Sequence, residues 1–125
     1  MESRGKMLDT LLHVSIEKGP SAVRSELFGG RGEVRVWSLL DVEADPFTAV
    51  LSCELAPGGS VGPHVQEEFP EIVIGVEGHG EATVDARLHG LSSGDAVYLP
   101  LGSVLTIENR SPDEPLRYLI IKARK

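Results

Sequence analysis

Short apolar runs, separated by turn-forming residues, recur along the chain from residue 33 to its end. Each run has the length and the Val, Ile and Leu content typical of a β-strand. Glycine and proline fall mostly between the runs, where tight turns require them. The expected strands are EVRVWSLL (33–40), FTAVLSCEL (47–55), EIVIGVE (71–77), EATVDA (81–86), DAVYLP (95–100), SVLTIEN (103–109) and LRYLIIKA (116–123). The pattern therefore predicts an all-β sandwich or small barrel.

Helical periodicity is confined to the segment KMLDTLLHVSIEKG, residues 6–19. Its first half spaces apolar residues as a helix face would, whereas its second half alternates like a strand. At most one short helical turn is expected there. We therefore divide the chain into residues 1–32, an arm or strands that pack on the barrel, and residues 33–125, the barrel domain.

Two of the expected strands, 47–55 and 116–123, carry apolar residues on both faces. A strand with a single buried face should alternate between apolar and polar residues. A second covering layer is therefore expected, either another sheet or another subunit. We expect a homodimer.

Charge and composition exclude several classes of function. The chain has 125 residues, which fits one domain, and its formal net charge is -7 with the basic residues scattered. Nucleic acid is not an expected partner, because binding it requires a clustered basic patch. No segment reaches the ~18 apolar residues of a membrane span, so a cytoplasmic protein without a membrane partner is expected. The single cysteine, Cys53, is expected to be a buried, inert thiol.

Two sets of residues combine glycine or proline with potential ligands at regular intervals. The first set is Gly58, His64, Gln66, Glu71 and Gly78, and the second is Gly94, Pro100, Gly102, Leu105 and Asn109. These spacings resemble the two motifs of the cupin superfamily, G-x5-H-x-H-x3-4-E-x6-G and G-x5-P-x-G-x2-H-x3-N. The resemblance covers residues 58–109 and implies a double-stranded β-helix, the jelly-roll barrel of small single-domain cupins of the cupin 2 type.

The resemblance also implies four places for metal ligands. In a typical cupin they hold a divalent metal through three histidines and a glutamate; here they contain His64, Gln66, Glu71 and Leu105. A glutamine offers only a neutral amide oxygen and a leucine offers nothing. Iron dioxygenase chemistry is disfavoured, because it needs two histidines and a carboxylate. The expected cofactor is none, or a weakly bound divalent metal (Zn, Mn, Ni or Fe) held by His64, Gln66 and Glu71 with water.

The first functional hypothesis is a binding module for a small, mostly apolar organic molecule. Barrel mouths commonly hold pockets with apolar walls and a few placed polar groups. His64 and Glu71 would help to orient the polar end of the ligand. The other residues assigned to ligand or substrate binding are Gln66, Val73, Tyr98 and Leu105.

Further hypotheses remain open. Resemblance to small cupins implies isomerases, cyclases and lyases among the family's activities, and here His64 and Glu71 would transfer protons. Alternatively, these two side chains and Gln66 form a satisfied polar contact without chemistry. The same three residues with water would give a weak metal enzyme or a metal sensor. A purely structural role predicts a filled interior without a cavity.

Overall fold

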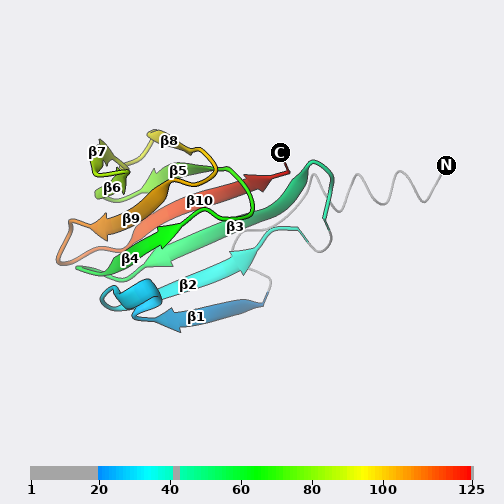
Figure 1. Cartoon of the computed structure of the whole chain (residues 1–125). Coiled ribbons are helices and arrows are strands. Elements are labelled where there is room, and N and C mark those ends of the chain that lie inside the picture. Colours follow the sequence, from blue (N-terminus) through cyan, green and yellow to red (C-terminus); the bar gives the residue numbers. More distant parts are fainter. Residues whose placement is uncertain (1–19, 41–42, 125) are drawn as a thin grey trace.

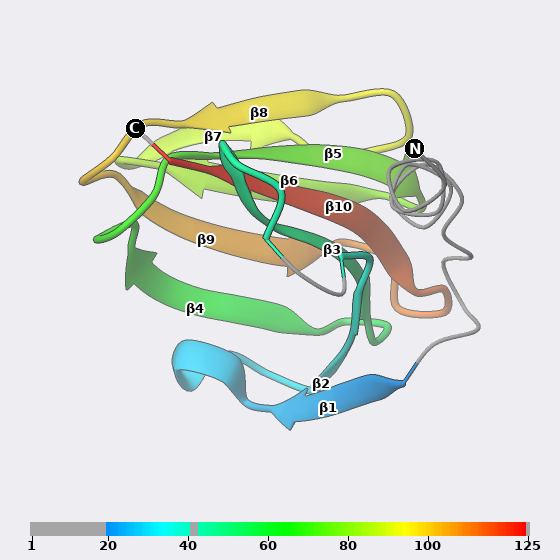
Figure 2. The same cartoon turned by 90° about the vertical axis from the view of Figure 1, so that its right-hand side faces the viewer.

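The computed structural model describes residues 20–40 and 43–124, and in these ranges the protein is almost entirely β-strand. Two antiparallel sheets face one another, as Figures 1 and 2 show. The larger sheet has the order β1 (Ser21–Ser25), β2 (Glu33–Ser38), β3 (Phe47–Leu55), β10 (Leu116–Ala123), β5 (Glu71–Glu77) and β8 (Ala96–Leu99). The smaller sheet has the order β4 (Ser60–Val65), β9 (Val104–Asn109), β6 (Gly80–Val84) and β7 (Arg87–Gly90). The all-β, jelly-roll prediction is confirmed.

The sequence prediction missed three strands, of which β4 matters most. Its sequence, SVGPHV, contains Gly62 and Pro63, which both weaken the signal of a strand. Proline is tolerated because β4 is an edge strand of the smaller sheet, where a missing N–H breaks no ladder. The register between β4 and β9 shifts between Val61 and His64, at these same two residues.

The N-terminal part of the described chain packs on the sheets. Strand β1 extends the larger sheet by pairing with β2, and a short 3-10 turn, η1 (Leu27–Gly29), contacts β4. Figure 2 shows η1 beside β4 at the edge of the molecule. The expected helical turn in residues 6–19 lies outside the described residues. Within the described ranges, we find no helix of sufficient length and hydropathy for a membrane crossing.

The core lies between the two sheets and follows from the alternation of the strands. The largest side chains that are fully buried include Leu55, Leu91, Leu99, Leu105, Leu116 and Tyr118. Each such apolar side chain contributes about 2 kcal/mol through its removal from water. Gly78, which follows β5, and Gly80, which begins β6, are needed for different reasons. Gly78 has a φ of 97°, whereas a Cβ on Gly80 would meet Leu116 Cδ2 at 2.4 Å.

Part of the outer face of the larger sheet is also apolar. Val50, Ile121, Ile72 and Tyr98 form a cross-strand row on β3, β10, β5 and β8. Ile72 and Tyr98 are exposed in the single chain. The expected covering layer for strands 47–55 and 116–123 is therefore the second sheet, which covers their inner faces. The homodimer stays a prediction.

Candidate functional site

A cavity of about 160 Å³ lies between the sheets, where β4 and β9 face the larger sheet. Its aliphatic lining consists of Leu27, Val34, Val36, Leu51, Val61, Leu105, Ile107 and Ile120. The other side chains that line it are Phe28, Cys53, His64, Glu71, Tyr118 and Lys122. The structure therefore brings His64, Glu71 and Leu105 to one cavity, and most of the wall that surrounds them is apolar.

His64 reaches the cavity from β4, just after the register shift. Its Nδ1 lies 3.2 Å from the carbonyl oxygen of Gly62. A carbonyl can only accept, so we assign the imidazole hydrogen to Nδ1, which leaves Nε2 as a proton acceptor. Burial lowers the pKa of His64; the bond to Gly62 opposes this shift and the positive charge of Lys122 adds to it. The imidazole is therefore neutral at neutral pH.

Phe28 covers His64 from outside the two sheets. The two rings are stacked, with centroids 4.2 Å apart and an interplanar angle of 12°. Phe28 belongs to η1, and this turn approaches β4 closely because position 62 is glycine: a Cβ there would lie 1.9 Å from the Phe28 carbonyl oxygen. The backbone of Arg31 and Ser60 fastens the same segments together by reciprocal N–H···O bonds of 3.1 and 2.8 Å.

Glu71 lies on β5, in the opposite sheet from His64, and is only 3% exposed. Its Oε2 has no hydrogen-bond partner among the residues that the structure describes. The nearest charge is the ammonium of Lys122 on the neighbouring strand β10, with Nζ 3.8 Å from Oε2. This distance allows an ion pair but exceeds that of a hydrogen bond. Burial raises the pKa of Glu71, and Lys122 opposes the shift.

The four places that resemble metal-ligand positions do not form a metal shell. Leu105 is the direct cross-strand neighbour of His64 and presents only methyl groups. Gln66 lines an adjoining outer opening of about 410 Å³ instead of the inner cavity. Within residues 20–40 and 43–124, no group of three His, Cys, Asp or Glu side chains is placed to hold a metal ion. The donor set therefore does not fit the divalent metal that the family resemblance implies.

Cys53 and Tyr118 both line the cavity and are cross-strand partners on β3 and β10 of the larger sheet. Burial raises the pKa of the Cys53 thiol to about 12. Burial likewise raises the pKa of Tyr118. Both groups therefore stay protonated at neutral pH, and the prediction of an inert, buried thiol agrees with this setting.

Besides Gln66, two further residues assigned to the cavity from sequence lie elsewhere. Tyr98 is 62% exposed on the outer face of β8, because Val97 and Leu99 take the inner positions of this strand. Its assignment to the wall of the cavity is therefore wrong. Val73 does face inward and is fully buried, but it packs in the core and does not line the cavity.

Sequence reasoning also missed Lys122 and Phe28. Lys122 follows Tyr118 and Ile120 at intervals of two along β10, which places all three on the cavity side. That spacing is visible in the sequence, but a strand with apolar residues on both faces does not reveal which face lines a cavity. Phe28 carried no such signal, because it lies in an irregular turn.

Asn109 is a second buried polar residue of the motifs, and it lies outside the cavity. Its Nδ2 donates to the carbonyl oxygens of Leu55, Ala56 and Glu114 at 3.2, 3.1 and 2.8 Å. Its Oδ1 accepts from the backbone N–H of Ser111 at 2.9 Å. The side chain thus joins the ends of β3 and β9 to the loop that precedes β10.

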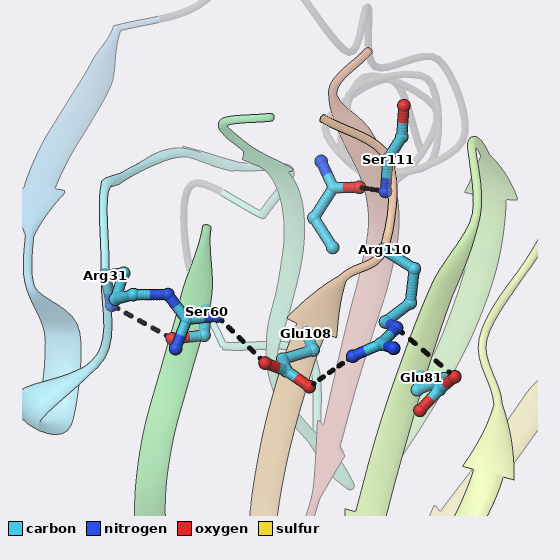
Figure 3. A network of polar contacts seen from close by, with 7 residues as sticks. Arg31, Ser60, Glu81, Glu108, Arg110 and Ser111 are labelled. Carbon is cyan, nitrogen blue, oxygen red and sulfur yellow. Dashed lines mark hydrogen bonds and ion pairs between the residues drawn. The ribbon is translucent and has the colours of Figure 1, made fainter. Parts of the chain in front are cut away.

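The outer face of the smaller sheet carries an exposed polar network, shown in Figure 3. Glu108 on β9 pairs with Arg31 at 2.8 Å and with Arg110 at 3.1 Å, and Arg110 also lies 3.5 Å from Glu81 on β6. The hydrogen bond from Arg31 lowers the pKa of Glu108. None of these side chains lines the cavity, so the network belongs to the surface.

Comparison with known proteins gives consistent matches. The family model described as "Cupin domain" matches residues 51–122. Dimethylsulfoniopropionate lyase DddW of Ruegeria pomeroyi is 38% identical over 90 residues, in an alignment that covers 65% of this chain and 59% of that protein. The chain thus spans about three-fifths of the length of this curated relative.

Solved structures support the fold. A protein of Thermotoga maritima, described as a predicted oxalate decarboxylase, superposes with a TM-score of 0.83 at 27% identity, over 90% of this chain and 99% of that one. The polyketide cyclase RemF of Streptomyces resistomycificus gives 0.73 at 20% identity, over 90% of this chain and 79% of its own, which supports the fold alone.

Proposed function

The chain belongs to the cupin domain family, and on that premise we propose that it is a small-molecule cupin whose cavity transfers protons without a metal, in a lyase or isomerase reaction. His64 acts as the base and Glu71 as the acid. The absence of a metal from the proposed reaction is supported by the side chains at the four ligand places. Leu105 lies beside His64, where a metal would need a further ligand.

One observation carries the proposed role of Glu71: its Oε2 atom is buried at the wall of a cavity without a hydrogen bond from any described residue, and its one charged neighbour, Lys122 Nζ, lies 3.8 Å away. Buried polar atoms in folded proteins nearly always have a hydrogen-bond partner, because an unpaired one costs about 1–3 kcal/mol. A side chain with a purely structural role would therefore be expected to use both oxygens. We infer that the bound molecule supplies the missing hydrogen-bond partner of Glu71 Oε2.

The placement of the two groups suits proton transfer across a bound molecule. His64 approaches from the smaller sheet and Glu71 from the larger one, so a molecule in the cavity lies between them. A neutral imidazole can remove a proton from carbon, and a carboxyl with a raised pKa can deliver one to the leaving group or to another carbon. The aliphatic wall limits access of water to the reacting groups.

The relative that is called a dimethylsulfoniopropionate lyase supports an elimination reaction. The test is a panel of small organic acids with an acidic C–H bond, beginning with dimethylsulfoniopropionate, incubated in deuterated water and followed by proton NMR. We expect at least one compound to exchange its C–H or to be cleaved.

His64→Gln and Glu71→Gln should each slow this reaction by about 100-fold or more. His79→Gln and Glu81→Gln are matched controls, because neither residue lines the cavity, and both should leave the rate unchanged. The proposal is wrong if no compound reacts, or if the two cavity variants react at the native rate.

The mainly aliphatic lining also favours a second candidate, a binding module without catalysis. In that case compounds of the panel should raise the melting temperature of the protein but should remain unchanged after prolonged incubation. Thermal shift and NMR measured on the same samples separate the two functions.

A further inference from the structure

The cavity contains one positive charge, which comes from a residue outside both motifs. Among the described residues that line the cavity, Lys122 is the sole lysine or arginine, and the imidazole of His64 is neutral. Its side chain is 35% exposed, whereas that of its neighbour Glu71 is 2% exposed. The ammonium therefore lies between the buried interior and the solvent.

Lys122 lines both the inner cavity and the outer opening, so it stands where the two meet. An ammonium has three N–H donors. Glu71 Oε2 lies 3.8 Å from the ammonium and forms an ion pair with it, at a distance longer than that of an ordinary hydrogen bond, so this contact occupies at most one of the three donors. Donors of this kind are available to a group that enters from the outer opening.

We propose that Lys122 binds a carboxylate of the ligand and that the site takes a small organic monocarboxylate, with the acid group at Lys122 and the carbon chain in the aliphatic interior. This inference deepens the proposed function and rests on it. It names the class of substrate that the His64 and Glu71 pair would act on.

The dimensions of the cavity agree with such a ligand. A cavity of about 160 Å³ that continues into the outer opening at Lys122 suits a small organic acid. With its carboxylate at the mouth, the chain of such an acid would extend between β4 and β5. The carbons next to the carboxylate would then lie between His64 and Glu71.

The acidic residues of the outer opening do not oppose this binding. Glu67 and Glu68 are exposed, so water and salt screen their charges. Glu43 is paired with the guanidinium of Arg124. Lys122 is therefore the positive charge that a ligand meets where the outer opening joins the cavity, and an anionic group is the complement to an ammonium.

The alternative is that Lys122 merely neutralises Glu71. The two cases differ in their preference between a charged and a neutral ligand of the same shape. The probes are therefore propionate and its neutral isostere propionamide, titrated into the full chain and followed by the chemical shifts of the His64 ring protons. If Lys122 only neutralises Glu71, the two probes should bind equally.

We expect the native protein to bind propionate with a Kd in the millimolar range and propionamide about tenfold more weakly or worse. Lys122→Met should lose this preference, and Lys122→Arg should keep it. Arg110→Met is the matched control, because it removes the same charge from the exposed network of Figure 3 and should leave the preference unchanged.

Three outcomes would overturn the inference: equal binding of the two probes by the native protein, binding of neither at 50 mM (about ten times or more the expected Kd), or an unchanged preference in Lys122→Met. If Lys122→Met does not fold, the double variant Lys122→Met, Glu71→Gln removes the buried carboxyl together with the ammonium. Its preference for propionate over propionamide is then measured instead and should likewise be lost. Failure of the proposed function is distinguishable, because it appears as absent turnover in the panel while the preference for propionate persists.

Discussion

Asn109 and Glu71 are both buried polar residues of the two motifs, yet their surroundings are opposite. Asn109 is 4% exposed and makes hydrogen bonds to three carbonyl oxygens and one backbone N–H. Glu71 is 3% exposed and leaves one oxygen without a hydrogen bond among the described residues. Burial alone is therefore no guide to the role of a polar side chain.

The difference separates a structural residue from a candidate functional one. A fully bonded side chain holds segments together, and its loss exposes several backbone groups at once. A partly bonded side chain at a cavity is less stabilising for the fold and more available to a ligand. Substitutions should divide accordingly: those near Asn109 change stability, and those near Glu71 change binding and its dependence on pH.

Asn109→Ala should have the largest effect on stability. It leaves the carbonyl groups of Leu55, Ala56 and Glu114 without their amide donor, and each lost bond costs about 1 kcal/mol or more. We expect the free energy of unfolding in urea to fall by about 3 kcal/mol. Ligand binding per folded molecule should be unchanged. A loss of stability below about 1 kcal/mol would contradict the assignment of Asn109 as a structural residue that differs from Glu71.

Leu105→His tests whether the cavity that contains His64 and Glu71 can be converted into a metal site. The new imidazole would stand directly opposite His64 across two paired strands, and imidazole is a good ligand for zinc and nickel. We expect zinc affinity, measured by competition with a chromophoric chelator, to rise about tenfold or more, which corresponds to about 1.4 kcal/mol.

The matched control is Leu88→His, which adds a histidine at an exposed leucine of β7. This variant should keep the zinc affinity of the native protein. If both variants bind zinc equally, position 105 does not face the same space as His64.

Glu71→Gln should change the dependence of stability on pH. The unfolded chain has the ordinary glutamate pKa near 4.5, and burial raises the pKa in the folded protein. The stabilisation from this shift is fully present below the unfolded pKa and is lost as pH rises through the folded pKa. The native protein should therefore lose stability relative to Glu71→Gln as pH rises above about 4.5.

Urea unfolding of both proteins at several values between about pH 4.5 and pH 8 measures this gap. Glu81→Gln, which removes a carboxylate at a half-exposed site on β6 outside the cavity, is the control and is measured in the same way. A gap that is constant with pH would contradict the assignment of a raised pKa to Glu71.

Arg110→Met should have the smallest effect. Its ion pairs with Glu108 and Glu81 are exposed, and exposed pairs contribute about 0.5 kcal/mol or less because water and salt screen them. The free energy of unfolding in urea should change by about that amount, and less in high salt. A change above about 1 kcal/mol would show that this exposed network stabilises the fold as Asn109 does.

Most of the fold could be predicted from sequence because strands leave a local signal. The expected runs 71–77 and 116–123 coincide with β5 and β10, since alternation and β-branched content act within a few residues. Strand β4 could not be predicted in this way. Its glycine and proline are permitted by its place at the edge of a sheet, which is a property of the tertiary structure.

The candidate site could be predicted only in part. Motif spacing placed His64, Glu71 and Leu105 together, because they occupy fixed positions on paired or facing strands. Spacing did not reveal that Gln66 lines a different opening, or that Lys122 comes from the last strand. These facts depend on which strands become neighbours, and the sequence of each strand alone does not contain them.

Because Phe28 stacks on His64, one wall of the cavity is formed by the η1 turn, which precedes the strands that carry the motifs. A chain shortened to begin at Glu33 would keep the facing sheets but leave His64 open to solvent. Water would then compete for the imidazole, and on the proposed function an acid bound in the cavity would dissociate sooner. The smallest unit expected to bind such a ligand therefore includes the segment before the barrel, with Phe28.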